Sequence, residues 1–153
     1  MRTINITTHL DAAPDVIRKH VMTPRLLNYV VAGLMKFQPI QPASFPHRWS
    51  PGNYRVRMLA FHVIPIGWQN VGIELPEEGD DWFVRDKGSG SIARIWDHLI
   101  FIGPDGAGTR YVDRIRIDAG VLTGPVALYA KLFYRYRQRR WRKLVRLCFS
   151  PLT

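Results

Sequence analysis

The feature that most constrains the fold is a long uninterrupted segment near the carboxyl end, residues 123–148. It reads TGPVALYAKLFYRYRQRRWRKLVRLC, and neither Gly nor Pro occurs in it after Pro125. Proline suits the first turn of a helix, and Thr123 or Gly124 suits the cap before it. We therefore predict one helix from Pro125 to Cys148, roughly 24 residues and about 36 Å long.

The predicted helix has two faces when its residues are placed at about 100° intervals. One face is apolar and largely aromatic: Val126, Tyr129, Phe133, Tyr136, Leu144, Leu147 and Cys148, with Tyr134, Trp141 and Val145 at its flank. The other face is basic: Lys131, Arg135, Arg139, Arg142, Lys143 and Arg146. Arg137 and Arg140 fall inside the aromatic arc. The aromatic face needs a large apolar surface to cover it, which the rest of the chain has to supply.

The net charge of +10 is concentrated on this helix. From Lys131 onward the chain has eight Lys and Arg and no Asp or Glu, whereas the preceding residues are nearly balanced. Such a face suits the phosphates of nucleic acid or of anionic lipid. The simpler interpretation is a solvated helix back whose long side chains cover apolar surface, and it is favoured because basic clusters predict binding only weakly.

The length of the chain and its single cysteine bound the class of protein. A chain of 153 residues fits one domain, residues 1–153, with a substantial core. Cys148 alone excludes an internal disulfide and agrees with a reducing compartment. The first residues lack the apolar stretch of a signal peptide, and no apolar run is long enough to span a membrane. We expect a cytoplasmic protein.

The remaining residues alternate and break in a pattern typical of an α+β domain. Residues 2–10 alternate as a strand, and two short helices follow, opened by Pro14 and Pro24. Six strands precede the final helix, at residues 34–40, 54–63, 68–75, 82–87, 92–102 and 109–117, with turns at 64–67 and 88–91. This order predicts a curved antiparallel sheet that packs against the carboxyl-terminal helix.

The last pair of strands allows a register to be predicted. With residues 103–108 as a six-residue loop, the facing pairs are Ile102–Thr109, Ile100–Tyr111, His98–Asp113 and Trp96–Ile115, with Asp97–Arg114 on the reverse face. This register collects the large apolar side chains on one face and pairs opposite charges. A shift of two residues would keep the same faces.

Several short motifs follow one another along the chain: Ala13-Pro14, Ile64-Pro65 with Trp68, Asp86 with Gly88 or Gly90, Trp96-x-His98, Gly108-Thr109, Asp113, and Phe133-Tyr134-Arg135 with Arg139-Arg140-Trp141. In this order and spacing, nearly the whole chain resembles the START-like, or SRPBCC, superfamily of helix-grip proteins. The resemblance implies a deep apolar cavity between the sheet and the last helix, used for lipids, polyketides or other hydrophobic molecules. It implies no catalytic residue, because only some members are enzymes and they share no catalytic set.

The cavity that the resemblance implies would be lined from the inner face of the strands and from the last helix. The candidate ligand-binding residues are Tyr54, Met58, His62, Trp68, Trp96, His98, Tyr111, Asp113, Tyr129, Phe133 and Arg140. Apolar walls with a few polar groups are typical of ligand pockets. The same apolar residues would also fill a solid core, and only the resemblance favours a hollow one.

His98 and Asp113 are the candidate catalytic residues. Asp113 would hold the imidazole in one tautomer and leave its other nitrogen free for a ligand or as a base. A buried pair that satisfies only itself is the favoured alternative. Arg140 needs a carboxylate or backbone carbonyls, with Asp113 as the first choice, or else it receives an anionic head group. Arg137, nearer the helix edge, is expected to extend to solvent.

These patterns lead to three hypotheses about function. The first is a carrier or sensor that binds a hydrophobic small molecule. The second is an enzyme of the cyclase or dehydratase kind, with His98 as acid or base on a polyketide-like substrate. The third is an interaction module that docks its basic helix face on anionic lipid or RNA. The five histidines lack metal-ligand spacing, so we expect no metal or cofactor. Monomer and dimer both remain open.

Overall fold

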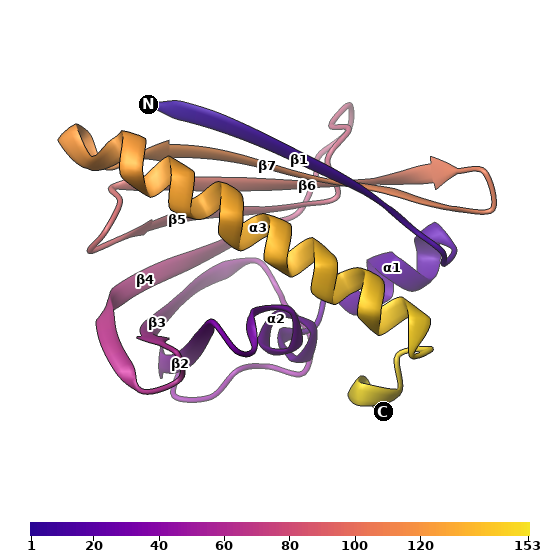
Figure 1. The fold of residues 1–153 in the computed structure, drawn as a ribbon, viewed down its shortest axis with the longest axis horizontal. Helices are drawn as coiled ribbons and strands as arrows, with labels where there is room; N and C mark the ends of the chain where they lie inside the picture. Colours follow the sequence, from indigo (N-terminus) through magenta and orange to yellow (C-terminus); the bar gives the residue numbers. More distant parts are fainter.

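A computed structural model describes all residues, 1–153, as a curved seven-stranded antiparallel sheet with three α-helices packed against it (Figure 1). The strands are β1 (Arg2–Leu10), β2 (Met35–Gln41), β3 (Gly52–Ala60), β4 (Ile64–Glu74), β5 (Val84–Gly90), β6 (Ile95–Asp105) and β7 (Gly108–Asp118). The helices are α1 (Pro14–Val21), α2 (Pro24–Val31) and α3 (Thr123–Arg146). The predicted α+β class, with two short helices after the first strand and a long final helix, is confirmed.

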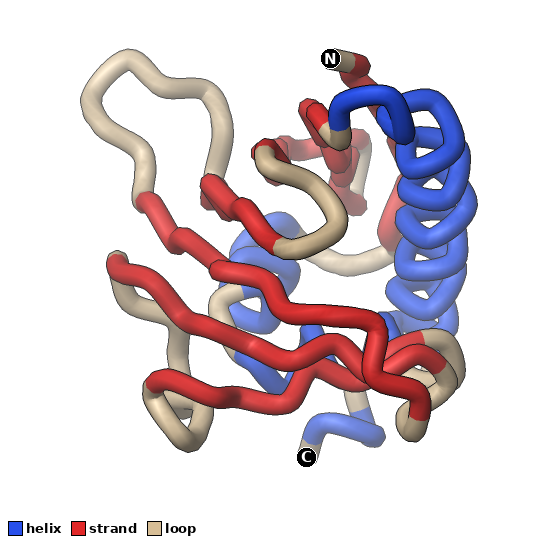
Figure 2. Tube along the Cα trace, turned by 90° about the vertical axis from the view of Figure 1, so that its left-hand side faces the viewer, coloured by secondary structure: helices blue, strands red, loops and turns tan.

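The strand order is β1-β7-β6-β5-β4-β3-β2, so the first and last strands of the chain pair with each other. The pair α1–α2 carries the chain from one edge strand of the sheet, β1, to the other, β2. Viewed from the side in Figure 2, the strands curve strongly, with α3 on one side and the short helices behind. A sheet of this curvature has a concave side, and the helices cover that side.

The two short helices begin where their sequences predict. Each has a proline in its first turn, Pro14 in α1 and Pro24 in α2, where the missing N–H costs nothing. The hydroxyl of Thr23 accepts a hydrogen bond from the Leu26 N–H at 3.3 Å and so caps α2. Both helices turn their apolar side chains into the common core of the protein.

Helix α3 spans 24 residues, but its buried face is rotated from the predicted one. Its buried residues include Ala127, Ala130, Tyr134, Gln138 and Trp141, which pack on the sheet side, whereas Tyr129 is 47% exposed. Phe133 and Leu144 of the predicted apolar face are buried, but the buried face is centred on the flank of the predicted one. Tyr134 and Trp141, from that flank, lie against aromatic rings of β6 and β7, and the small residues Ala127 and Ala130 are buried beside them. None of the helices is long and apolar enough to cross a lipid bilayer.

The predicted register of the last hairpin is wrong by two residues. Ile102 pairs with Tyr111 and His98 with Ile115, because residues 103–105 continue β6 and the turn contains only Gly106 and Ala107. Gly106 has a φ of +60°, which favours glycine in a tight turn after an aspartate. The shift keeps every side chain on its predicted face.

Two predicted turns lie within strands instead. Residues 64–67 belong to β4 and absorb an irregularity in its pairing with β3, while residues 88–90 end β5. At Gly88 and Gly90 an added Cβ would lie 2.8 Å and 2.5 Å from backbone oxygens of neighbouring strands, so the glycines allow close strand approach rather than a turn. The turn between β3 and β4 is at residues 61–63, so it begins three residues before the predicted turn at 64–67.

Candidate functional site

A cavity of about 570 Å³ lies between the sheet, α2 and the inner edge of α3. Of the 31 residues that line it, 25 are hydrophobic. The sheet contributes the floor, through side chains such as Met58, Val71 and Ile100, and α3 contributes Val126 and Phe133. A space of this size falls within the range of small-molecule pockets in proteins, about 300–1,000 Å³. The arrangement is chemically suited to a molecule that is mostly apolar.

The cavity reaches the surface at one end of the molecule. Six of its lining residues are also exposed: Phe61, Trp68, Ile92, Leu122, Pro125 and Tyr129. They come from the β3–β4 turn, β4, the β5–β6 turn and the amino-terminal end of α3. Exposed aromatic and aliphatic side chains that also line a cavity mark its mouth. An apolar molecule entering here would meet apolar side chains at every step.

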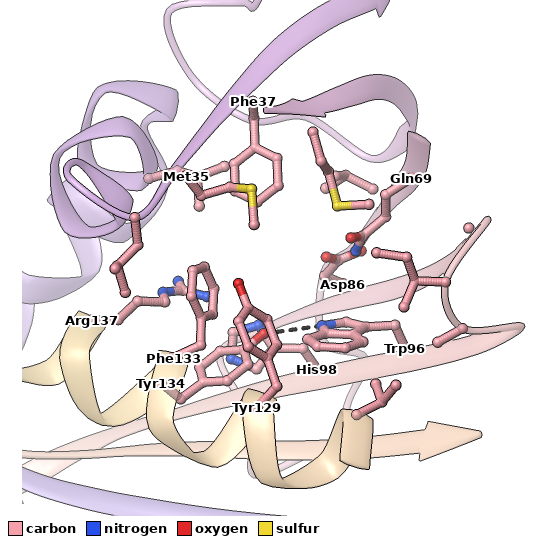
Figure 3. Close-up of a pocket in the computed structure, with 18 of the residues that line it drawn as sticks. Met35, Phe37, Gln69, Asp86, Trp96, His98, Tyr129, Phe133, Tyr134 and Arg137 are labelled. Atoms are coloured by element: carbon pink, nitrogen blue, oxygen red, sulfur yellow. Dashed lines mark hydrogen bonds between the residues drawn. The ribbon is translucent and has the colours of Figure 1, made fainter. Parts of the chain in front are cut away.

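Four polar side chains interrupt the apolar lining: Gln69, Asp86, His98 and Arg137 (Figure 3). Gln69 and Asp86 come from the neighbouring strands β4 and β5, His98 from β6, and Arg137 from α3. Asp86 and His98 are directly opposite each other in the β5–β6 ladder, so their side chains lie on the same face of the sheet. With the hydroxyls of Tyr111, Tyr129 and Tyr134, these groups could orient a polar part of a ligand.

The His98 imidazole belongs to a buried hydrogen-bond network. Its Nε2 donates to the Asp113 carboxylate at 2.7 Å, and Gln138 donates to the same carboxylate at 2.8 Å and to the Ile6 carbonyl at 2.8 Å. Because a carboxylate only accepts, Nε2 carries the hydrogen and Nδ1 presents a lone pair. Burial lowers the pKa of His98 in spite of the neighbouring Asp113, so the imidazole is neutral near pH 7. Nδ1 makes no hydrogen bond within the protein.

Asp86 is the second titratable group of the cavity. Burial raises the pKa of its carboxyl to about 7, and a hydrogen bond from the Gly72 N–H, at 2.9 Å, and the charge of Arg137 oppose that shift. Its side chain is removed from bulk water by the surrounding protein, although part of its surface borders the cavity. Near neutral pH, Asp86 can therefore either donate or accept a hydrogen bond.

Arg137 lines the cavity beside the aromatic ring of Tyr134. Its guanidinium lies 4.7 Å from the centre of the Tyr134 ring, and the side chain is only 8% exposed. The Tyr134 hydroxyl in turn accepts a hydrogen bond from the Trp96 indole at 3.1 Å, drawn as a dashed line in Figure 3. Tyr134 is thus fixed between α3 and β6, and it fixes the plane of the guanidinium.

Seven of the eleven predicted site residues line the cavity: Met58, Trp68, Trp96, His98, Tyr111, Tyr129 and Phe133. The other four, Tyr54, His62, Asp113 and Arg140, do not. Tyr54 lies at the far end of β3, where it packs against Trp49 and its hydroxyl donates to the Ser50 carbonyl. His62 lies in the β3–β4 turn, exposed, and its Nε2 accepts from the Gly33 N–H. The alternation of side chains along β3 does not extend to His62, because the strand ends at Ala60.

The prediction for Arg137 is wrong, whereas Arg140 has one of the two kinds of partner predicted for it, a backbone carbonyl, although not the first choice, Asp113. Arg140 donates to the Tyr29 carbonyl at 3.1 Å and stacks on the Tyr29 ring, so it joins α3 to α2 and does not reach Asp113. Gln138 occupies the place beside Asp113 that was expected for Arg140. Arg137, expected to extend to solvent, is buried at the cavity. The rotation of α3 explains the burial of Arg137, because it turns position 137 inward.

Sequence reasoning also missed Asp86, Gln69 and Tyr134 as cavity residues. A signal was present for Asp86, which shares the inward face of its strand with Val84, a residue of the predicted core type. A signal was present for Gln69 as well, because it precedes Val71 and Ile73 at intervals of two residues and so shares their face of β4. Tyr134 lay at the flank of the predicted apolar face and became central only through the helix rotation.

The architecture, a curved antiparallel sheet closed by a long carboxyl-terminal helix over a cavity, is the helix-grip fold of the START superfamily. A START superfamily protein from Mycobacterium smegmatis aligns over 95% of this chain and 98% of its own, with a TM-score of 0.67 and 14% identity. A protein from Chromobacterium violaceum aligns over 94% and 97%, with a TM-score of 0.70 and 15% identity. The Aha1 dimer from Colwellia psychrerythraea aligns over 95% and 96%, with a TM-score of 0.64 and 9% identity.

No protein-family model and no curated protein matches the sequence. The similarity therefore lies in the fold, and the predicted START-like fold is confirmed. At 9–15% sequence identity, the side chains that line the cavity differ from those of the similar structures. The chemistry of a ligand therefore has to be inferred from the residues of this chain.

Proposed function

We propose that this protein binds a hydrophobic small molecule in the cavity between the sheet and α3, as a carrier or sensor. The observation that supports the proposal is the cavity itself, about 570 Å³ with a mouth of exposed apolar residues. Because the cavity opens at the surface, water can enter it, although its walls are mostly apolar. An apolar occupant would take those walls out of contact with water, which contributes about 25 cal/mol per Å² of apolar surface.

Filling the cavity from α3 should abolish binding. Val126 lines the cavity and is half-buried, so Val126→Trp places an indole inside it. The measurement is fluorescence titration with N-phenylnaphthylamine, a neutral apolar dye whose emission rises in apolar surroundings. We expect Val126→Trp to weaken dye binding by about tenfold or more, which is about 1.4 kcal/mol.

The matched control is Leu128→Trp on the same helix, where the side chain is 61% exposed and does not line the cavity. It adds the same indole and should leave the dye affinity within about twofold of the wild type, a change of under about 0.5 kcal/mol. If the wild type does not bind the dye, or if both variants bind it as the wild type does, the cavity is not a binding site and the proposal is wrong.

The enzymatic alternative depends on His98. Its neutral imidazole, held by Asp113 through Nε2, presents Nδ1 as a candidate base for a substrate in the cavity. A cyclase or dehydratase would bind its substrate in the same place, so this alternative adds a chemical step to the proposed binding. We keep binding as the primary proposal because the network of Asp113 with His98 and Gln138 is also what a structural pair requires.

A second candidate function, docking on an anionic surface, is favoured by the outer face of α3. Its six cations, Lys131, Arg135, Arg139, Arg142, Lys143 and Arg146, are exposed, and none forms an ion pair with a carboxylate. Arg142 donates to the Thr8 hydroxyl at 2.9 Å, while the others are free of side-chain partners. An unpaired basic row of this kind attracts phosphates through long-range electrostatics.

Reversing three of these charges tests that candidate. The combined change Arg135→Glu, Arg139→Glu and Lys143→Glu should abolish binding to vesicles containing phosphatidylserine, or to single-stranded RNA, at about 0.15 M salt. The control, Arg25→Glu, Lys36→Glu and Arg57→Glu, alters three exposed cations elsewhere and changes the net charge equally. If both variants lose binding equally, the effect is due to the net charge of the protein and not to this face of α3. If the wild type binds neither the vesicles nor the RNA, the docking function is wrong.

A further inference from the structure

Arg137 is a buried cation without a hydrogen-bond partner. The side chain is 8% exposed, and its Nε is fully buried with no acceptor in reach. None of the hydrogen bonds or ion pairs of the chain involves its terminal nitrogens, although a guanidinium offers five N–H donors. Arg140, one turn further on, has the Tyr29 carbonyl. The packing of α2 against α3 thus supplies an acceptor to Arg140, whereas no neighbouring element supplies one to Arg137.

The charge of Arg137 is retained. Burial by itself would lower the pKa of the guanidinium, but the nearby Tyr134, Asp113, Tyr111 and Asp86 together raise the pKa above its ordinary value. An ionised group out of bulk water is costly unless it is paired and hydrogen-bonded. The protein therefore carries a fixed positive charge on the wall of an otherwise apolar cavity.

The carboxylates near Arg137 are already engaged elsewhere. Asp113 accepts from His98 and Gln138, and it does not line the cavity. Asp86 accepts from the Gly72 N–H and forms no ion pair with Arg137. These acids influence the guanidinium through space without saturating its donors. The missing acceptors have to come from what occupies the cavity.

We propose that the ligand is an amphipathic organic monocarboxylate, with an apolar body in the cavity and its carboxylate paired with the guanidinium of Arg137. This rests on the proposed function, whose cavity it specifies further. Arg137 is the only Lys or Arg among the lining residues, so the wall balances one negative charge below about pH 7, where Asp86 is protonated. The planar fork of a guanidinium matches a carboxylate through two parallel hydrogen bonds, and stacking on Tyr134 at 4.7 Å holds that fork in place.

The test compares two probes that differ only in charge: dansyl-labelled undecanoic acid and its primary amide, titrated by fluorescence at low salt and about pH 6, where the acid probe is ionised and Asp86 is mostly protonated. The wild type should bind the acid about tenfold or more tightly than the amide, since charge-assisted pairs are about twice as strong as neutral ones. Arg137→Met, which keeps the stem of the side chain without its charge, should bind both probes alike. Arg137→Lys should recover part of the preference.

The control is Arg135→Met, which removes an exposed cation from the same helix and should keep the wild-type preference. Equal binding of the acid and the amide by the wild type overturns the inference while leaving the proposed function in place, and it requires no variant to fold. A preference for the acid that survives Arg137→Met also overturns it. Binding of neither probe, together with failure of the neutral dye, overturns the proposed function itself.

Discussion

Replacing Asp113 by alanine should lower the free energy of unfolding by about 3–5 kcal/mol, measured by urea denaturation at pH 7. The carboxylate is 1% exposed and accepts from both His98 and Gln138. Its removal leaves two buried donors without an acceptor, each of which costs about 1–3 kcal/mol. The pairing of Gln138 with the Ile6 carbonyl, which joins α3 to β1, would weaken as well.

The matched control for this prediction is Asp81→Ala. Asp81 is exposed in the loop before β5 and has no side-chain partner. It should change the free energy of unfolding by less than about 0.5 kcal/mol. A cost for Asp113→Ala no larger than that of the control would mean that the network of His98, Asp113 and Gln138 contributes nothing to folding.

The second large effect has the opposite sign: Asp86→Asn should stabilise the protein at pH 8, by at most about 4 kcal/mol. Because the folded pKa of Asp86 is raised to about 7, the folded state holds a proton that the unfolded state releases near pH 4. The stability of the wild type should therefore fall as the pH rises from about 4 to about 7, and level off above it. Asparagine stays neutral and still accepts from the Gly72 N–H.

The decisive readout for Asp86 is the pH dependence. The gain from Asp86→Asn, followed by denaturation at several pH values, should diminish steadily as the pH is lowered towards 4, where both proteins are neutral at this position. Loss of the favourable interaction with Arg137 would reduce the gain without changing its trend. A gain that is the same at pH 4 and pH 8, or no gain at pH 8, would show that Asp86 is not desolvated as described.

Most of the fold could be predicted from local patterns. Proline and cap residues mark the short helices at Pro14 and Pro24, and the unbroken segment after Pro125 predicts the long helix. Alternation assigned residues to the correct faces of the last hairpin. The register was wrong because alternation repeats every two residues, and only the tight turn at Gly106 selects between the two solutions.

The candidate site was harder to predict because it depends on how α3 is rotated. Helical periodicity identifies an apolar face to within a residue or so, and the buried face is centred on the flank of the predicted one, at Ala130, Tyr134 and Trp141. That small rotation turns Arg137 into the cavity, while Arg140 pairs with the Tyr29 carbonyl. Sequence patterns also cannot distinguish aromatic side chains that fill a core from those that surround a cavity.

The basic face and the cavity are separate features of one helix. The cations from Lys131 to Arg146 face solvent, while Val126, Phe133 and Arg137 border the cavity. Changes on one face can therefore be made without altering the other, which is why the charge-reversal and cavity-filling variants test different functions. A variant of the outer face that altered binding of the neutral dye would indicate coupling between them.

Native mass spectrometry of the freshly purified protein, before and after incubation with N-phenylnaphthylamine, tests ligand binding most directly. We expect a one-to-one complex with a small organic molecule in the wild type and in Leu128→Trp, and its absence in Val126→Trp. If the wild type and Leu128→Trp show only the mass of the unliganded protein, even with the dye in excess, this expectation is contradicted.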